Sequence, residues 1–287
     1  MRQFGAQSMV LPLRRVLVRR PDAAFADADP AAWHYTARPD LAAAQEEHDA
    51  FVRILTAAGA EVIRHDAPAP GMADAIYVHD PVLITERGAI LMRMGKSLRR
   101  GEEEAIGRCL EAAGVPIHYR LHGDALGEAG DCLWLDSSTL AVGQGYRTNA
   151  AGRAQLREAL GPAIDVVPVE LPYFTGPDAC LHLMSLISLV DADLAVVYSP
   201  LMPVPFRERL RGRGIRLVEV PEAEFATLGS NVLTLAPRHC VMLEGNPVTR
   251  ERLVAAGCRV ETYRGREISL KAEGGPTCLT RPVLRGG

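Results

Sequence analysis

The sequence predicts an α+β fold in which five similar modules close into a ring, as the blades of a propeller do. Three observations predict it. A helical pattern that ends in glycine recurs at intervals of about fifty residues, a strand-like run follows each helix, and paired apolar runs around a turn separate the repeats. An ordinary αβ sandwich whose elements happen to be similar in length is the alternative.

The five helical patterns share one end signal. Each closes on a glycine, which supplies the left-handed residue that terminates a helix. They cover residues 42–59, 101–114, 149–161, 205–214 and 249–257. The strand-like runs that follow them cover residues 60–66, 115–121, 164–171, 215–221 and 258–264.

Four hairpins are expected from apolar runs that flank short polar turns. They cover residues 75–93, 131–143, 181–199 and 231–245. The fifth run, "CLTRPVLR" at 278–285, has no second half after it, and "RRVLVRRP" at 14–21 is the strand that would pair with it. This pairing would close the ring and make residues 1–287 one catalytic domain.

Composition excludes several classes of function. The net charge of −3 is spread along the chain, which provides no basic patch for nucleic acid or an anionic membrane. Two arginine pairs near the start are not followed by an apolar segment, and no stretch approaches a membrane span, so a cytoplasmic protein is expected. Whether the chain works alone or as a homodimer is left open.

The cysteines are scattered, with no C-x-x-C spacing and no tight Cys/His cluster. A structural zinc site is therefore not expected, and most of these thiols should be buried apolar groups in a reducing compartment. The six are Cys109, Cys132, Cys180, Cys240, Cys258 and Cys278.

Equivalent positions in a ring of modules converge on one end of its axis, and the loops that lead into the hairpins carry reactive side chains. Read in module order, these are Asp74 and Asp80, Glu128 and Asp131, His182, Asn231, and Cys278. A cysteine and a histidine from distant parts of the sequence can together carry out nucleophilic catalysis. A bound cation would stabilise the thiolate form of the cysteine. Taken singly, the acids could equally cap helices and the histidine could be a core residue.

The carboxylates indicate which cation would bind. Asp74, Asp80 and Glu128 around a small cavity would repel one another unless a positive group paired with them, and a guanidinium matches such a set with its fork of N–H donors. Arg93 and Arg147, at the ends of two second strands, could bind a substrate carboxylate or be solvated. Together these residues point to arginine or a derivative as the substrate.

Several motifs carry a resemblance to a known family: "EAGD", "GYRTN", "LHLMS", "GSNVL", "EGNPVT" and "EGGPTCLT". The chain resembles the guanidino-group-modifying enzymes of the pentein superfamily, first the dimethylarginine dimethylaminohydrolases and next the arginine deiminases. The resemblance runs from Leu13 to Arg285 and implies a five-module αβ propeller.

The resemblance also implies roles for single residues. Cys278 would be the nucleophile, His182 the general acid and base, and Glu128 the carboxylate that orients His182. Asp74 and Asp80 would hold the guanidinium nitrogens, and Arg93 and Arg147 the substrate carboxylate. No metal or other cofactor is implied, because the substrate carries the charge that a Lewis acid would supply.

Two positions depart from the family patterns. Met184 stands where many of the dimethylarginine hydrolases have a basic residue and the deiminases an aspartate, which disfavours a deiminase. His79 stands where an acid is common in the hydrolases. "GSNVL" and "LTRP" resemble the deiminases instead.

Four alternatives stay open beside the hydrolysis of a methylated arginine. An arginine deiminase would attack the same carbon, and an amidinotransferase would pass the amidino group to an amine. A catalytically silent binding protein and a zinc hydrolase are the others. The long segment 22–40, rich in small residues, is expected to form a lid near the site.

Overall fold

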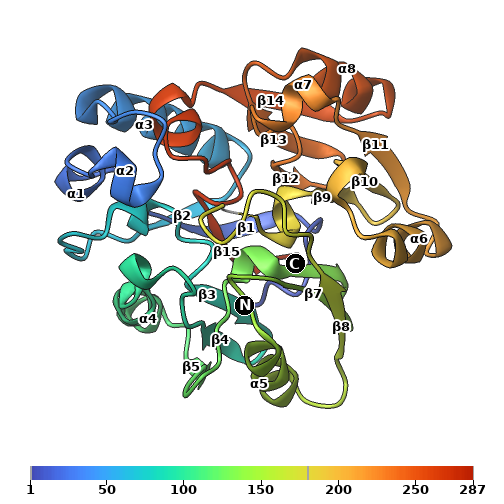
Figure 1. Ribbon diagram of the computed structural model, residues 1–287, viewed down its shortest axis with the longest axis horizontal. Coiled ribbons are helices and arrows are strands. Elements are labelled where there is room, and N and C mark those ends of the chain that lie inside the picture. Colours follow the sequence, from blue (N-terminus) through green and yellow to red (C-terminus); the bar gives the residue numbers. More distant parts are fainter. Residues whose placement is uncertain (1, 180, 287) are drawn as a thin grey trace.

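The strands form five three-stranded sheets that are arranged around a common centre (Figure 1). The structure is a computed structural model that describes residues 2–179 and 181–286, so Cys180 lies outside the described residues. Three of the sheets are β3(Val82–Thr85)-β4(Gly88–Leu91)-β5(Ile117–Arg120), β6(Cys132–Asp136)-β7(Thr139–Gln144)-β8(Asp165–Glu170) and β9(Ile187–Asp191)-β10(Leu194–Val197)-β11(Arg216–Glu219). The other two are β12(Val232–Ala236)-β13(His239–Leu243)-β14(Arg259–Tyr263) and β15(Arg281–Arg285)-β1(Leu13–Val18)-β2(Glu61–Arg64). The predicted five-module propeller is confirmed.

One long helix belongs to each sheet and lies on the outside of the ring (Figure 1). These helices are α3(Leu41–Ala57), α4(Glu102–Ala112), α5(Ala150–Leu160), α6(Val204–Gly212) and α8(Pro247–Ala255). The shorter helices are α1(Ala23–Ala26), α2(Pro30–Trp33) and α7(Glu222–Phe225). Among the described helices, none has both the length and the apolar character needed to cross a bilayer.

All five helix-ending glycines have a positive φ, as the sequence predicts, although Gly161, with a ψ of 177°, lies outside the left-handed helical region. Their φ angles are 91° at Gly59, 83° at Gly114, 79° at Gly161, 75° at Gly214 and 88° at Gly257. Side chains with a Cβ rarely adopt such angles, so a glycine at each end lets the chain leave the helix and enter the next strand.

The strand after each helix joins the hairpin before that helix, not the hairpin after it. β5, for example, pairs in parallel with β4, and α4 makes the connection between them. This differs from the expected module, in which the strand led into the following hairpin. Helix, strand and hairpin follow one another along the sequence in the same order in both arrangements, so the sequence pattern does not distinguish them. The pairing is decided because two parallel strands need a long connection such as a helix between them.

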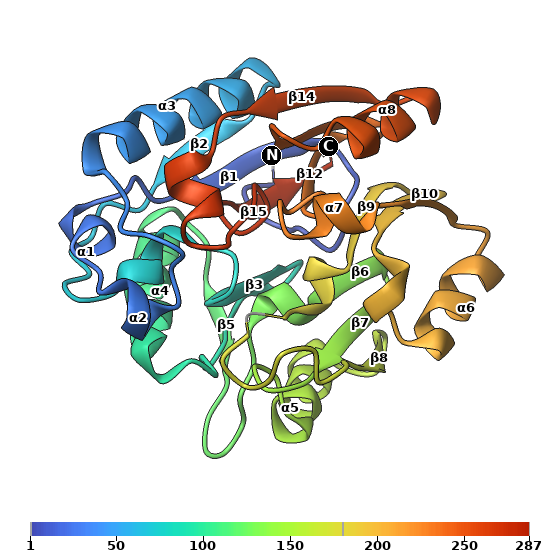
Figure 2. The same ribbon diagram turned by 45° about the horizontal axis from the view of Figure 1, so that its top comes forward.

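The N-terminal strand closes the ring, as the sequence predicts. β1 is the middle strand of its sheet, antiparallel to β15 and parallel to β2. Val16 and Leu17 of β1 and Val283 of β15 are completely buried. The strands from the two ends of the chain therefore lie side by side (Figure 2).

The loops that lead into three hairpins form short 3₁₀ turns where apolar strand was expected. These turns are η1(Ala73–Ile76), η3(Ala129–Asp131) and η4(Leu183–Ser185). The predicted hairpin at 75–93, for example, first becomes strand at Val82. These turns carry polar side chains to one end of the ring.

His48, on the buried face of α3, should make the fold sensitive to acid. Burial lowers its pKa from about 6.5 to about 4, and neither ring nitrogen has a hydrogen-bond partner among the described residues. The unfolded chain binds a proton on His48 at higher pH than the folded chain does. The folded state therefore loses stability as the pH falls from about 6.5 to about 4. Between pH 7 and pH 5, we expect the free energy of unfolding to fall by about 1–2 kcal/mol less in His48→Leu than in the parent.

Urea unfolding at both pH values measures this difference. His122→Leu, at an exposed position outside the core, is the control and should keep the parent's pH dependence. An equal loss of stability in the parent and in His48→Leu would contradict the prediction.

Candidate active site

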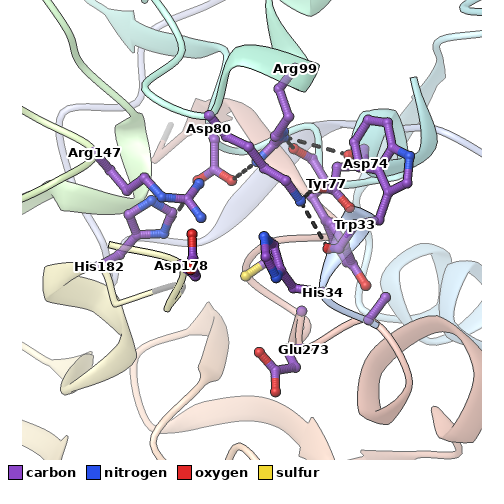
Figure 3. A pocket seen from close by; sticks show the side chains of 14 residues that line it. Trp33, His34, Asp74, Tyr77, Asp80, Arg99, Arg147, Asp178, His182 and Glu273 are labelled. Atoms are coloured by element: carbon purple, nitrogen blue, oxygen red, sulfur yellow. Dashed lines mark hydrogen bonds and ion pairs between the residues drawn. The ribbon is translucent and has the colours of Figure 1, made fainter. Parts of the chain in front are cut away.

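A cavity lies where the hairpin-leading loops converge (Figure 3). The residues that line it come from segments spread over most of the chain: Trp33, His34, Asp74, Tyr77, Asp80, Lys96, Arg99, Arg147, Asp178, His182, Ala272, Glu273, Gly274 and Cys278. Five of the predicted site residues are therefore brought together: Asp74, Asp80, Arg147, His182 and Cys278.

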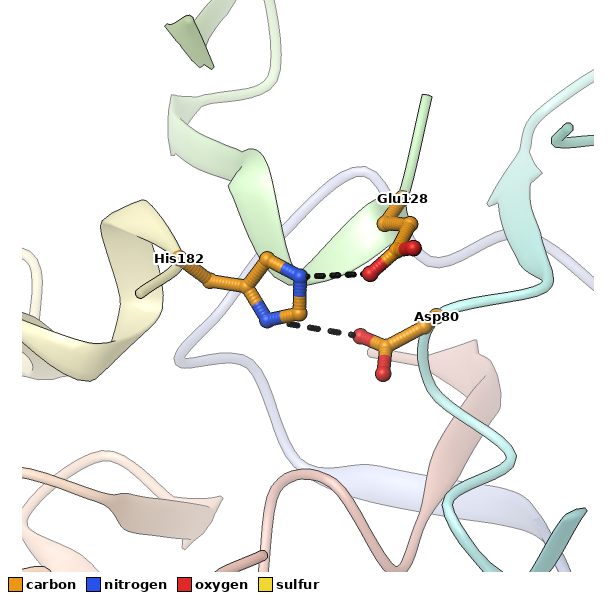
Figure 4. A group of neighbouring side chains, drawn as sticks. All are labelled: Asp80, Glu128 and His182. Carbon is orange, nitrogen blue, oxygen red and sulfur yellow. Dashed lines mark hydrogen bonds and ion pairs between the residues drawn. The ribbon is translucent and has the colours of Figure 1, made fainter. Parts of the chain in front are cut away.

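His182 lies between two carboxylates (Figure 4). Its Nε2 is 2.8 Å from Oε2 of Glu128, and its Nδ1 is 3.9 Å from Oδ1 of Asp80. The His182 side chain is 6% exposed. Asp131 supports the turn that presents it, because its Oδ1 accepts a hydrogen bond of 2.9 Å from the backbone N–H of Leu183.

Glu128 lies behind His182 and outside the cavity wall. It is completely buried, and besides His182 its Oε2 accepts a hydrogen bond of 3.2 Å from Arg147. Its Oε1 accepts from the backbone N–H groups of Gly95 and Lys96 at 2.9 and 3.1 Å. Burial alone would raise the pKa of Glu128, but the hydrogen bond with His182 and the charge of Arg147 hold this pKa well below its usual range. An ionised carboxylate therefore orients His182 and stabilises its protonated form.

Asp80 is held in place by Arg99, a residue that the sequence analysis missed. Arg99 Nη1 donates to Oδ2 of Asp80 at 2.6 Å, and Glu102 binds the other side of the guanidinium. Burial opposes ionisation of Asp80, but His182 and Arg99 outweigh it and lower the pKa. Oδ1 of Asp80 accepts no hydrogen bond within the described part of the chain.

Asp74 lies across the cavity from His182, beside Trp33 and Tyr77 (Figure 3). Its Oδ1 accepts a hydrogen bond of 2.8 Å from the hydroxyl of Tyr35. Its Oδ2 is 2.7 Å from Nζ of Lys96, which the sequence analysis also missed. Both carboxylate oxygens of Asp74 thus have partners from the protein.

Cys278 is partly buried and lies three residues before β15. Nδ2 of Asn231 donates to its Sγ at 3.3 Å, and Oδ1 of Asn231 accepts from the backbone N–H of Thr277 at 3.1 Å. A hydrogen bond to sulfur favours the thiolate. Asn231 comes from the equivalent loop of module four, so the comparison of modules had placed it correctly.

The two glycines before Cys278 have a steric function. A Cβ on Gly275 would lie 2.3 Å from the side chain of Asn231, and one on Gly274 would lie 2.1 Å from the ring of Tyr77. Neither neighbour could move without disturbing the cavity wall. Only glycine lets the backbone bring Cys278 this close to its donor.

Arg93 and Arg147 are placed differently, although both had been expected at the substrate carboxylate. Arg147 lines the cavity, whereas Arg93 is not among the lining residues. An antiparallel bridge pairs the backbone of Arg93 with that of Gly127, and its guanidinium donates to the carbonyl of Ala125 at 3.3 Å. In this structure Arg93 therefore pairs with its own hairpin's neighbourhood and not with the cavity lining, and its contact with a substrate carboxylate stays a prediction.

The expected lid does reach the site. Trp33 and His34, from the segment 22–40, line the cavity. A signal for the missed Lys96 and Arg99 was present in the sequence, because "GKSLRR" follows the second strand of one hairpin just as "GYRTN" follows that of the next. Comparing the loops that leave the hairpins, and not only those that enter them, would have found both.

His79 and Met184, the two unusual positions, lie behind the cavity wall. His79 is buried, its Nδ1 is 2.9 Å from the carbonyl of Thr280, and burial together with the charge of Arg281 lowers its pKa to about 3. Met184 belongs to the apolar core between the sheets. Neither is among the residues that line the cavity.

Asp80, Glu128 and His182 lie close enough together to be considered as metal ligands. Their geometry favours another function. The two carboxylates face opposite ring nitrogens of His182, so they do not converge with one nitrogen on a common point (Figure 4). The arrangement suits an imidazole whose ring is fixed for proton transfer.

Comparison with known proteins identifies the family. A family model described as "N,N dimethylarginine dimethylhydrolase, eukaryotic" matches residues 18–283. The chain belongs to this family. A relative from Streptomyces coelicolor, named N(G),N(G)-dimethylarginine dimethylaminohydrolase, is 30% identical over 94% of this chain and 97% of its own length.

Two further matches agree with this family. An arginine deiminase from Mycobacterium marinum is 31% identical over 55% of this chain and 46% of its own length. The solved structure of a cysteine-to-serine mutant of the Pseudomonas aeruginosa dimethylarginine dimethylaminohydrolase, complexed with citrulline, has 25% identity and a TM-score of 0.78, and covers 94% of this chain and 98% of that one. The chain is therefore a pentein-type hydrolase of guanidino C–N bonds.

Proposed function

We propose that the enzyme hydrolyses arginine or an N-methylated arginine to citrulline through a covalent intermediate on Cys278. The observation that carries this proposal is the convergence in one cavity of the Cys278 thiol, the His182 imidazole with Glu128 behind it, and a carboxylate oxygen of Asp80 that accepts no hydrogen bond from the described residues. The relative that was solved with citrulline supports the choice of product.

The first half of the reaction breaks the C–N bond. Asp80 pairs with the guanidinium and keeps it flat, and Arg147, which lines the cavity and also pairs with Glu128, binds the substrate carboxylate. The Cys278 thiolate, with Asn231 donating to its sulfur, attacks the guanidinium carbon. His182, charged and oriented by Glu128, gives its proton to the departing amine or ammonia, and a thiouronium remains on the sulfur.

The second half releases the product. His182, now neutral, takes a proton from water, and the resulting hydroxide adds to the thiouronium carbon. The C–S bond then breaks as the proton of the added hydroxyl passes to water and from there to the released amine or ammonia. Citrulline leaves, and Cys278 returns to the thiolate while His182 keeps its proton. Each group ends the cycle in its starting state, so no further reactant is needed.

A substrate panel tests the proposal. The wild-type enzyme is incubated with arginine, monomethylarginine, N,N-dimethylarginine and guanidinoacetate, and citrulline or the shorter ureido acid is measured together with the released amine. Citrulline from at least one arginine supports the proposal, and no ureido product from any of them refutes it. Added glycine or ornithine detects amidinotransfer, because a new guanidino compound would then replace citrulline.

A further inference from the structure

Lys96 occupies a part of the cavity where a substrate cation would be expected. Its Nζ is 2.7 Å from Oδ2 of Asp74 and donates to the carbonyl of Trp33 at 3.0 Å. The same ammonium lies 4.7 Å from the centre of the Trp33 ring. The Lys96 side chain is 12% exposed and that of Asp74 is 8% exposed, so this ion pair is shielded from water.

The two carboxylates in the cavity wall therefore differ in what they offer to a ligand. Asp74 has Tyr35 on one oxygen and Lys96 on the other. Asp80 has Arg99 on Oδ2, while Oδ1 accepts no hydrogen bond from the described residues and faces His182. A guanidinium can pair with Asp80 without displacing a protein group from that oxygen, but it can reach Oδ2 of Asp74 only by displacing an ammonium.

We propose that Lys96 is a specificity-determining residue that serves as the built-in counter-cation of Asp74 and limits how strongly the site favours a guanidinium over a neutral ureido group. This inference rests on the proposed function for the position of the substrate. If the inference is correct, Asp74 acts on the substrate only through Lys96. Of the two aspartates that the family resemblance places on the guanidinium, only Asp80 then pairs with it directly.

Electrostatics explains the effect. With Lys96 present, the pair of Lys96 and Asp74 is neutral overall and gives an incoming cation little attraction. Without the ammonium, a shielded carboxylate has no compensating charge, and a bound guanidinium would supply it. Citrulline has nearly the shape of arginine but no charge on its ureido group, so it would gain little from the same change.

Binding measurements on full-length chains test this inference without turnover. Arginine and citrulline are titrated calorimetrically into Cys278→Ser and into the same chain with Lys96→Met. We expect Lys96→Met to increase the ratio of the citrulline Kd to the arginine Kd about tenfold, the equivalent of about 1.4 kcal/mol. Lys96→Gln removes the charge but keeps a donor for Asp74, and it should shift the ratio in the same direction if Lys96→Met does not fold.

Lys271→Met is the matched control. Lys96 and Lys271 are the two lysines of the sequence. Lys271 pairs with Glu267 at 2.6 Å and, like Lys96, donates to a backbone carbonyl of the lid segment, that of Arg38 at 3.1 Å. If the selectivity reflects only a loosened lid, Lys271→Met will change the Kd ratio as much as Lys96→Met does; we expect it to leave the ratio within about twofold.

The outcomes separate this inference from the proposed function. An unchanged Kd ratio in both Lys96 variants overturns the inference, even if wild type produces citrulline. A tenfold shift with no citrulline from wild type supports the inference and refutes hydrolysis. Failure of arginine to bind any of the chains overturns the inference.

Discussion

Cys278→Ser should lower the rate of citrulline formation by roughly 10³-fold or more, because the hydroxyl is a far weaker nucleophile than the thiolate and the covalent route is lost. Asn231 donates to Sγ of Cys278, and this contact would not ionise a serine at neutral pH. Single-turnover and steady-state assays with the best substrate of the panel measure the loss.

Cys109→Ser is the control for this prediction. Cys109 is also partly exposed, but its Sγ donates to the carbonyl of Arg64, and burial raises its pKa. We expect it to keep wild-type activity. If Cys278→Ser retained more than a tenth of the wild-type rate while Cys109→Ser lost activity, the assigned nucleophile would be wrong.

Glu128→Gln should have the second largest effect, on both activity and stability. The carboxylate is buried against His182 and Arg147, and the amide that replaces it removes the negative charge that pairs with both groups. We expect kcat to fall roughly 10²–10⁴-fold, since the orientation and protonation of His182 are lost. The free energy of unfolding should fall by about 3–5 kcal/mol, the usual cost of breaking a buried ion pair.

Glu224→Gln separates these two effects. Glu224 is also buried, and it accepts hydrogen bonds of 2.8 Å from the backbone N–H groups of Val248 and Thr249 at the start of α8, away from the cavity. This variant should lose stability but keep kcat. A loss of kcat in Glu224→Gln that matches the loss in Glu128→Gln would show that activity follows stability alone.

The modular fold could be predicted because its signals are local. A glycine that must adopt a positive φ and a polar turn between apolar runs each act within a few residues, so they can be read without knowing the partner strand. The choice of hairpin for each post-helix strand could not be predicted in this way. That choice depends on which pairing a helix can bridge, and it was the main error in the expected module.

The site residues that occupy equivalent positions in the five modules could be predicted from the sequence. Cys278, His182 and Asp80 were found because each lies in a loop that leads into a hairpin. The bridge of Arg93 to Gly127 could not be predicted, because sequence spacing does not reveal it. Lys96 was missed because only the loops that enter the hairpins were compared, whereas Lys96 lies in a loop that leaves one and pairs with Asp74.

The closure of the ring by β1 has a consequence for how the enzyme could be inactivated. Cys278 lies three residues before β15, and β15 is held by antiparallel pairing with β1 from the other end of the chain. A single cleavage between β1 and α3 would cut the covalent link of the middle strand to the rest of the chain without touching any residue of the reaction. The position of the thiol would then depend on strand pairing alone, and activity measured against cleavage of this segment would show how far the site needs that link.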